Sequence, residues 1–318
     1  MALLPYEKPY KTPKLLINKL ITEELTIDQE NLSHAERVLS NVNYYRFKAY
    51  SSPFRVRGNG KFIPETTFDN IEQLYHFDEE LRNICFSHIS KLEIQLRSRL
   101  DQVIASSEND PFWYIKNSVY ATFGDMDSFA EHIEKKFQES DEEFVIHFKR
   151  NYKNPSNGDY PNLPPSWVAV ELFTLGTLNT LFLKLNIDHF NVGSSDDKNH
   201  LNIMSKEFGA ISFIQLRSWL EVIKQVRNKC AHHARLFNVK IKPWPRTSRL
   251  FEQTYKPEHE RRIYVSLWML HRMLNSIGTP KDTKHQIQEL FTMYPAAEKQ
   301  KKAMGFPSNW EEDPHWII

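Results

Sequence analysis

Apolar residues recur every three or four positions along most of the chain, which is the spacing of one helix face. The longest such segment, residues 68–105, contains neither proline nor glycine and predicts a single long helix. A first helix is expected after Thr12-Pro13, a typical N-cap followed by proline at the first helical position. Further helices are predicted over 28–39, 128–150, 164–185, 200–208, 212–235, 258–277 and 281–293. The pattern therefore predicts an all-α protein.

Turn-forming residues separate these segments. Gly58-Asn59-Gly60 lies between apolar residues and predicts either a small hairpin or a surface loop within 53–64. An aromatic and basic stretch occupies 43–50, a turn-rich linker 154–161 and a polar segment 191–199. We expect an N-terminal helical and extended segment over 1–64, a helical core over 65–240 and a C-terminal helical extension over 241–318.

Composition narrows the class of protein. Charged residues make up 25% and hydrophobic residues 40%, which indicates a globular chain. The 9 glycines form no phosphate-binding loop. Cys85 and Cys230 are too few for a disulfide framework or a four-cysteine zinc site, and they suit a reducing compartment. With neither a secretion signal nor a membrane span in the sequence, we expect a soluble, cytoplasmic protein without membrane association. Because the net charge is only +1, any nucleic-acid site must be a local patch.

The segment 212–235 carries the candidate chemistry. Its predicted apolar stripe consists of Leu216, Trp219, Leu220, Ile223, Val226 and Cys230, and the opposite face holds Arg217, Glu221, Gln225, Asn228 and His232. Arg227 lies about 40° from the stripe centre, where a guanidinium needs a partner. Glu171 occupies an apolar position of the segment 164–185 and is the predicted partner. The alternative is that both charges reach solvent at the edge of the bundle.

The residues Arg227-Asn-Lys-Cys-Ala-His-His-Ala-Arg-Leu-Phe-Asn238 resemble the Arg, polar residue, spacer, His motif of HEPN domains, in the form found in the Abi family of phage abortive-infection proteins. The resemblance extends along nearly the whole chain. It includes Asn43-Tyr-Tyr-Arg-Phe-Lys-Ala-Tyr50, Phe77-Asp78 with Leu81-Arg82, Pro164-Pro-Ser-Trp167 with Glu171, Gly176 and Leu178, and Gly305-Phe-Pro-Ser-Asn-Trp310.

This resemblance implies a HEPN-like helical bundle with additional N- and C-terminal helices, a homodimer that brings two motifs together, and metal-independent cleavage of RNA in phage defence or as a toxin. His232 would transfer the proton of a 2′-hydroxyl or of the leaving 5′-oxygen, and Arg227 would stabilise the phosphorane. Asn228 would orient His232 or hold a phosphate oxygen. Lys229, His233 and Arg235 are the expected RNA-binding residues. The chemistry requires neither a metal nor a cofactor.

Other interpretations remain open at this point. His232 could be a surface histidine that interacts with a helix C-terminus, and Lys229 and Arg235 could be solvated surface charges. Zinc binding by Cys230, His232 and His233 is a further alternative. His88 is best explained as a core histidine. The competing function is a catalytically inactive HEPN-like RNA-binding or regulatory module that is controlled by a small RNA. Between the adjacent histidines, helical phase favours His232 as the essential one, because it follows Asn228 by one turn.

Overall fold

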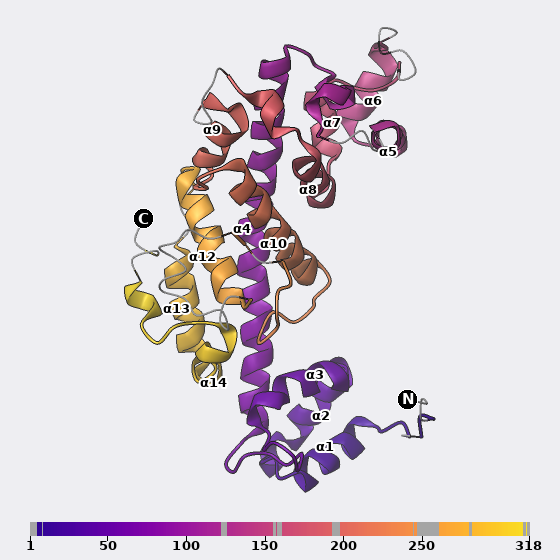
Figure 1. Ribbon diagram of the computed structural model, residues 1–318. Coiled ribbons are helices and arrows are strands. Elements are labelled where there is room, and N and C mark those ends of the chain that lie inside the picture. Colours follow the sequence, from indigo (N-terminus) through magenta and orange to yellow (C-terminus); the bar gives the residue numbers. More distant parts are fainter. Residues whose placement is uncertain are drawn as a thin grey trace. The chain divides into compact units, whose positions relative to one another are not determined.

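The computed structural model describes residues 5–7, 9–121, 126–154, 157, 161–192, 198–243, 245–246, 261–279, 282–313 and 316. Within these ranges every regular element is a helix, and backbone pairing is limited to isolated bridges. The predicted all-α fold is therefore confirmed (Figure 1). No helix in the described ranges is both long and apolar enough to cross a bilayer.

The chain forms two compact units, one of residues 1–82 and 285–303 and the other of residues 83–284 and 304–318. The division falls within α4 (Phe68–Glu108), so this 41-residue helix contributes to both units. It confirms the single long helix predicted over 68–105. The predicted domain boundaries at 64/65 and 240/241 stay predictions.

The first unit contains short helices around the beginning of α4. They are α1 (Pro13–Thr22), η1 (Gln29–Asn31), α2 (Leu32–Asn41), α3 (Tyr44–Ser51), η2 (Ser52–Phe54), most of α13 (Thr283–Met293), α14 (Pro295–Glu298) and most of η9 (Lys301–Met304). The predicted cap of α1 is present, because the Thr12 hydroxyl accepts a hydrogen bond from the Leu15 N–H across 3.4 Å. Within 53–64, where the sequence predicts either a small hairpin or a surface loop, the structure has one isolated antiparallel bridge between Arg55 and Phe62 and no named strand.

A buried polar triad joins α3 to α4 in this unit. Tyr50 Oη donates to Asp78 Oδ2 across 2.6 Å, and Arg82 Nη1 donates to the same oxygen across 2.6 Å. Asp78 is fully buried and Arg82 nearly so. These residues belong to the segments 43–50, 77–78 and 81–82 that carry the family resemblance. Their shared oxygen ties the two helices together.

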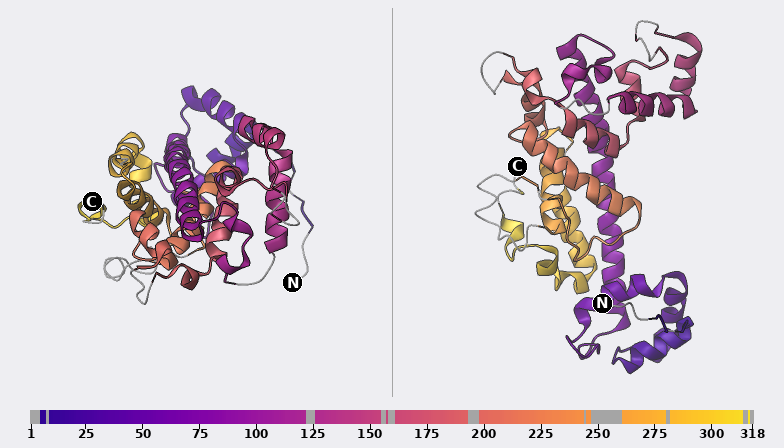
Figure 2. Two further views of the ribbon diagram at one scale, coloured as in Figure 1. Left: turned by 90° about the horizontal axis from the view of Figure 1, so that it is seen from above. Right: turned by 45° about the vertical axis from the view of Figure 1, so that its right-hand side comes forward.

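The second unit is built around the rest of α4 and α10. Its elements are η3 (Trp113–Ile115), η4 (Asn117–Val119), α5 (Met126–Glu139), α6 (Glu143–Asn151), α7 (Ser166–Ala169), η6 (Val170–Leu172), α8 (Leu175–Lys184), η7 (Ile187–Phe190), α9 (His200–Glu207), α10 (Phe213–Ala231), α12 (Ile263–Ser276) and η10 (Trp310–Glu312). Helix α10 packs against α8, α9 and α12 (Figures 1 and 2). His88 is buried on α4, as predicted for a core histidine.

Two helices that were predicted as continuous are broken in the structure. The segment 128–150 divides into α5 and α6, because the Ser140 hydroxyl accepts from the Glu142 N–H across 3.3 Å and Glu142 adopts extended backbone. The segment 164–185 divides at Phe173 and Thr174, where the Thr174 side chain caps α8. Serine and threonine hydroxyls compete for backbone donors in this way without interrupting an apolar pattern.

The other boundaries agree with the predictions to within a few residues, apart from the start of α12 and the end of α10. Helix α12 begins at Ile263, later than the predicted 258, and residues 258–260 lie outside the described ranges. Most of the predicted linker 154–161 and the middle of the polar segment 191–199 also lie outside them.

Candidate functional site

Helix α10 carries the predicted motif and is anchored by its apolar face. The Ser212 hydroxyl caps its beginning by accepting from the Gln215 N–H across 3.3 Å. The stripe predicted from the sequence is buried in full: Leu216, Trp219, Leu220, Ile223, Val226 and Cys230. Because burial of this stripe fixes the rotation of the helix, the positions of the flanking polar side chains follow from it.

Arg227, Asn228 and Lys229 are half-buried in the last turns of α10. Arg227 lies at the margin of the stripe, where its long side chain reaches water. No carboxylate pairs with its guanidinium among the residues that the structure describes. Access to solvent removes the desolvation cost that an unpaired inward charge would carry. The guanidinium is therefore available to an anion from outside the chain.

Glu171 does not neutralise Arg227, which corrects the sequence prediction. Its side chain is exposed on η6, and no ion pair joins it to Arg227 in the described parts of the chain. The prediction treated Glu171 as part of the same continuous helix as α8, and so placed its side chain on the apolar face. The break at Phe173 and Thr174 separates η6, which holds Glu171, from α8. Without that pair, Glu171 has no structural basis for orienting Arg227.

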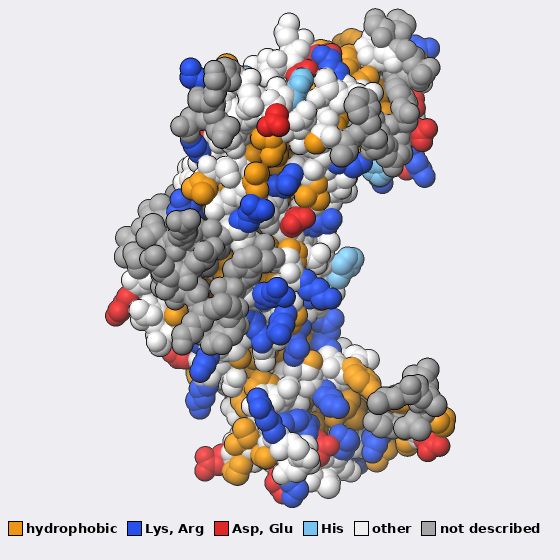
Figure 3. Space-filling view, in the orientation of Figure 1, with side chains coloured by type: hydrophobic (Ala, Val, Ile, Leu, Met, Phe, Trp, Pro, Cys, Tyr) orange, Lys and Arg blue, Asp and Glu red, His pale blue; other side chains and the backbone are white. Residues whose placement is uncertain are grey.

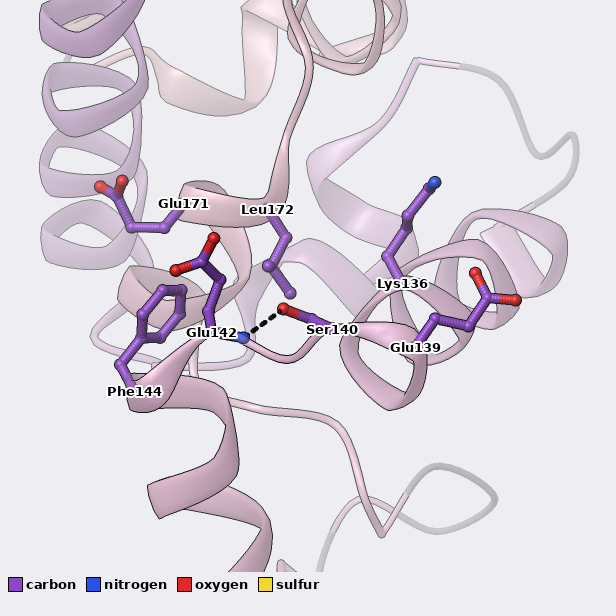
Figure 4. A pocket seen from close by; sticks show the side chains of 7 residues that line it. All are labelled: Lys136, Glu139, Ser140, Glu142, Phe144, Glu171 and Leu172. Carbon is purple, nitrogen blue, oxygen red and sulfur yellow. Dashed lines mark hydrogen bonds between the residues drawn. The ribbon is translucent and has the colours of Figure 1, made fainter.

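Glu171 instead lines an open pocket of about 610 Å³ between α5, α6 and η6 (Figure 4). The other lining residues are Lys136, Glu139, Ser140, Glu142, Phe144 and Leu172. Among the described lining residues, three carboxylates and one ammonium give this pocket a negative balance. A polyanion such as RNA is repelled by such a surface, so this pocket is no candidate for the RNA site.

The C-terminus of α10 is closed by a Schellman motif. The helix ends at Ala231, with His232 as its C-cap and His233 in the left-handed region at φ 51°. The His233 N–H donates to Cys230 O across 3.0 Å, and the Ala234 N–H donates to Lys229 O across 2.7 Å. These two bonds define the motif. The helix predicted to extend to residue 235 therefore ends four residues earlier.

The two histidines consequently leave the helix in different directions. His232 is exposed and continues the phase of the last turn, and its N–H donates to Asn228 O across 3.0 Å. This contact is between backbone atoms: no side-chain hydrogen bond joins Asn228 to His232 in the described structure. His233 is also exposed, but its backbone is outside helical geometry. The helical geometry predicted through residue 235 therefore does not hold at His233.

The segment after the motif is packed within the second unit. Leu236 and Phe237 are almost completely buried, and Asn238 accepts a hydrogen bond from Arg262 Nη1 across 2.9 Å. Further on, Trp219 Nε1 donates to Arg246 O, and the Arg246 N–H donates to Ser218 Oγ, each across 2.8 Å. The chain thus returns along α10, so that the turn with both histidines is fixed at its two ends.

A run of positive charge surrounds this turn. Residues 222–251 contain no Asp or Glu, although the whole chain has 40 of them against 41 Lys and Arg. The basic residues of the run are Lys224, Arg227, Lys229, Arg235, Lys240, Lys242, Arg246 and Arg249. Those in the described ranges are half-buried or exposed. Lys and Arg side chains gather over the end of α10 and the following segment (Figure 3).

Only three members of this run were predicted from the sequence as site residues: Arg227, Lys229 and Arg235. The missing signal was local charge: a 30-residue window without carboxylates in an almost neutral chain. Such a patch is the electrostatic footprint of a nucleic-acid binder.

Metal-binding side chains do not converge at the motif. Cys230 belongs to the buried stripe, whereas His232 and His233 are exposed. The ranges that the structure describes contain no group of three or more His, Cys, Asp or Glu side chains placed to hold a metal.

Comparison with known proteins adds one finding. Residues 37–238 match the family model that is described as Abi-like protein. The match covers more than half of the chain and extends to the end of the quoted motif at Asn238. No curated protein and no solved structure matches the chain.

Proposed function

Because this chain belongs to the Abi-like protein family, we propose that it acts in abortive infection, a defence against phage, as a metal-independent endoribonuclease. The proposed site is the C-terminal turn of α10. The observation that carries the proposal is the exposed His232, which follows the half-buried Arg227 by five residues at the end of α10; Arg227 has no carboxylate partner among the described residues, and both lie within a run that lacks carboxylates.

The residue types of this turn suit transesterification of RNA. An imidazole ring can accept the proton of the 2′-hydroxyl or protonate the departing 5′-oxygen. The guanidinium of Arg227 stabilises the added negative charge on phosphorus. The bond from the 2′-oxygen to phosphorus forms as the bond to the 5′-oxygen breaks. The product is a 2′,3′-cyclic phosphate.

The remaining motif residues bind the RNA backbone in this proposal. Lys229 and Arg235 contact flanking phosphates, Asn228 holds a phosphate oxygen, and His233 contributes at the edge of the site. Asn228 binds phosphate rather than orienting His232, since their side chains do not bond to each other. A second copy of the chain supplies the other Arg and His, so that the active form is a homodimer with a composite site.

A histidine comparison tests the proposal. His232→Ala, His233→Ala and the control His132→Ala, an exposed helical histidine on α5, are assayed on one RNA. We expect His232→Ala to abolish cleavage at native helicity, while His233→Ala keeps measurable activity and the control matches the parent. Full activity of His232→Ala would overturn the proposal. A folded but inactive His233→Ala beside an active His232→Ala would exchange their roles.

The second candidate is a catalytically inactive RNA-binding module that a small RNA controls. The basic run favours it, because phosphate binding needs these charges and no proton transfer. Expression in cells separates the two functions. If the parent is toxic and His232→Ala is tolerated at equal abundance, cleavage is supported. Equal toxicity of the two proteins supports binding alone.

A further inference from the structure

A groove of about 540 Å³ lies entirely within the first unit, between the segment that precedes α1, α1 itself, the end of α2 and the beginning of α3. Among the residues that the structure describes, four tyrosines and three lysines line it, and no acidic residue does. The α10 site does not include this groove, because α10 belongs to the other unit.

Three of these four tyrosines present their rings to solvent, and Tyr44 is half-buried. Tyr6, Tyr10 and Tyr45 are 75%, 85% and 69% exposed, whereas Phe47 and Tyr50 on the opposite side of α3 are 1% exposed. Helix α3 therefore buries one aromatic face in the core and displays another at the groove. The Asn43 side chain accepts from the Tyr45 N–H across 2.8 Å and fixes the start of the helix. Exposed aromatic surface of this density is typical of a binding site.

The lysines are placed among these rings. Lys19 Nζ donates to Tyr44 Oη across 3.0 Å and lies 5.4 Å from the centroid of that ring. Glu23 neutralises Lys19 from outside the groove. Lys11 and Lys48 are exposed, and neither has a carboxylate partner among the described residues. Two unpaired ammonium groups thus accompany the exposed tyrosines.

We propose that this groove binds single-stranded RNA, with bases stacked on Tyr10 and Tyr45 and the phosphate backbone held by Lys11 and Lys48. Interleaved aromatic rings and positive charges are the recognition chemistry of single-stranded nucleic acids, because every base has a flat face and every nucleotide a phosphate. An acidic peptide would use the lysines but would leave the ring faces without a stacking partner. The ligand class rests on the proposed function, and the groove is a second RNA contact on the same chain.

The test measures binding without turnover. Full-length protein with His232→Ala is titrated into a fluorescent 20-nucleotide poly-U RNA in EDTA, and Kd is measured by anisotropy at several salt concentrations. Two variants are made in this His232→Ala background: one also carries Tyr10→Ala and Tyr45→Ala, and the other also carries Lys11→Ala and Lys48→Ala. Tyr152→Ala and Lys135→Ala, which remove exposed residues outside the groove, are the controls.

We expect the double substitution Tyr10→Ala, Tyr45→Ala to raise the Kd for poly-U at least tenfold and to leave the salt dependence of Kd unchanged. The double substitution Lys11→Ala, Lys48→Ala should lower the slope of log Kd against log salt concentration by about 1.4, because each of the two lost phosphate contacts on a single strand contributes about 0.7. Circular dichroism confirms the fold of each variant. If the Tyr10→Ala, Tyr45→Ala variant is folded and binds poly-U as tightly as the Tyr152→Ala control, the proposal is overturned. Binding of polyglutamate but not of poly-U would also overturn it, in favour of an acidic protein.

These outcomes are separable from those of the proposed function. If the parent cleaves RNA and the groove variants bind it normally, only the groove proposal fails. If the parent never cleaves RNA but the Tyr10→Ala, Tyr45→Ala variant loses RNA binding, the groove proposal is supported and the endonuclease proposal fails.

Discussion

The backbone N–H of Ala234 donates to the carbonyl oxygen of Lys229 across 2.7 Å, and this bond ends α10 inside the motif. It places His232 on the last turn and His233 in left-handed backbone at φ 51°. Adjacent residues of identical chemistry thereby acquire different surroundings. Their distinction comes from the turn and not from a continuing helical face.

Substitution at His233 tests this turn. Left-handed backbone costs a residue with a β-carbon about 1–2 kcal/mol and is worst for β-branched side chains. We expect His233→Gly to raise the free energy of unfolding by up to about 1–2 kcal/mol, because His233 already bears this cost, and the β-branched His233→Val to lower it. Urea denaturation measures both. His232→Val is the matched control, since φ of −96° is allowed for any residue, and an equal loss there would contradict the turn.

Glu171→Gln should leave the melting temperature and the cleavage rate unchanged. The Glu171 carboxylate is exposed and has no partner among the described residues, so its removal breaks no interaction. Exposed substitutions of this kind change the free energy of unfolding by about 0.5 kcal/mol or less. Thermal melts and a cleavage assay check this. A melting temperature lower by several degrees would indicate that Glu171 does pair with Arg227.

The sequence predicted the helical fold and the buried stripe of α10 because apolar spacing reports which face enters the core. It did not predict where helices end. The breaks at Ser140 and Thr174 depend on single hydroxyl-to-backbone bonds, and the end of α10 depends on a histidine in a conformation that usually selects glycine. The pairing of Glu171 with Arg227 failed for the same reason. Helical phase was extended across a break that the apolar pattern does not reveal.

Asp78→Ala should destabilise the protein strongly. The Asp78 carboxylate accepts from both Tyr50 and Arg82 in a buried site, so its loss leaves a buried guanidinium without its ion-pair partner. Removing one member of such a pair costs about 3–5 kcal/mol. Glu139→Ala, which removes an exposed ion pair with Lys135, should cost less than about 1 kcal/mol. Urea denaturation compares them, and equal losses would contradict the role of the triad.

Stability should fall at alkaline pH. Burial raises the pKa of Tyr50, Tyr114 and Tyr120 well above the ordinary value of 10.0, and the Asp78 charge adds to the effect at Tyr50. The folded state therefore holds these protons more tightly than the unfolded chain. Their contribution is complete below about pH 10 and decreases above it, by up to about 1.4 kcal/mol per pH unit for each tyrosine.

Urea denaturation between pH 9 and pH 11.5 measures this decrease. Tyr120→Phe should reduce the slope, whereas Tyr152→Phe, at an exposed position, should leave it unchanged. A free energy of unfolding that stays constant through pH 11 would contradict the raised pKa of these buried tyrosines.

The chemistry of the RNA ends tests the proposed function most directly. Purified protein is incubated with RNA in EDTA, and the 3′ ends are identified by mass spectrometry, with His232→Ala beside the parent. We expect 2′,3′-cyclic phosphate or the derived 3′-phosphate from the parent, uncleaved RNA from His232→Ala, and no cleavage of DNA of the same sequence, because the 2′-hydroxyl is the nucleophile. Cleavage that needs added divalent ions and leaves 3′-hydroxyl ends would contradict the account.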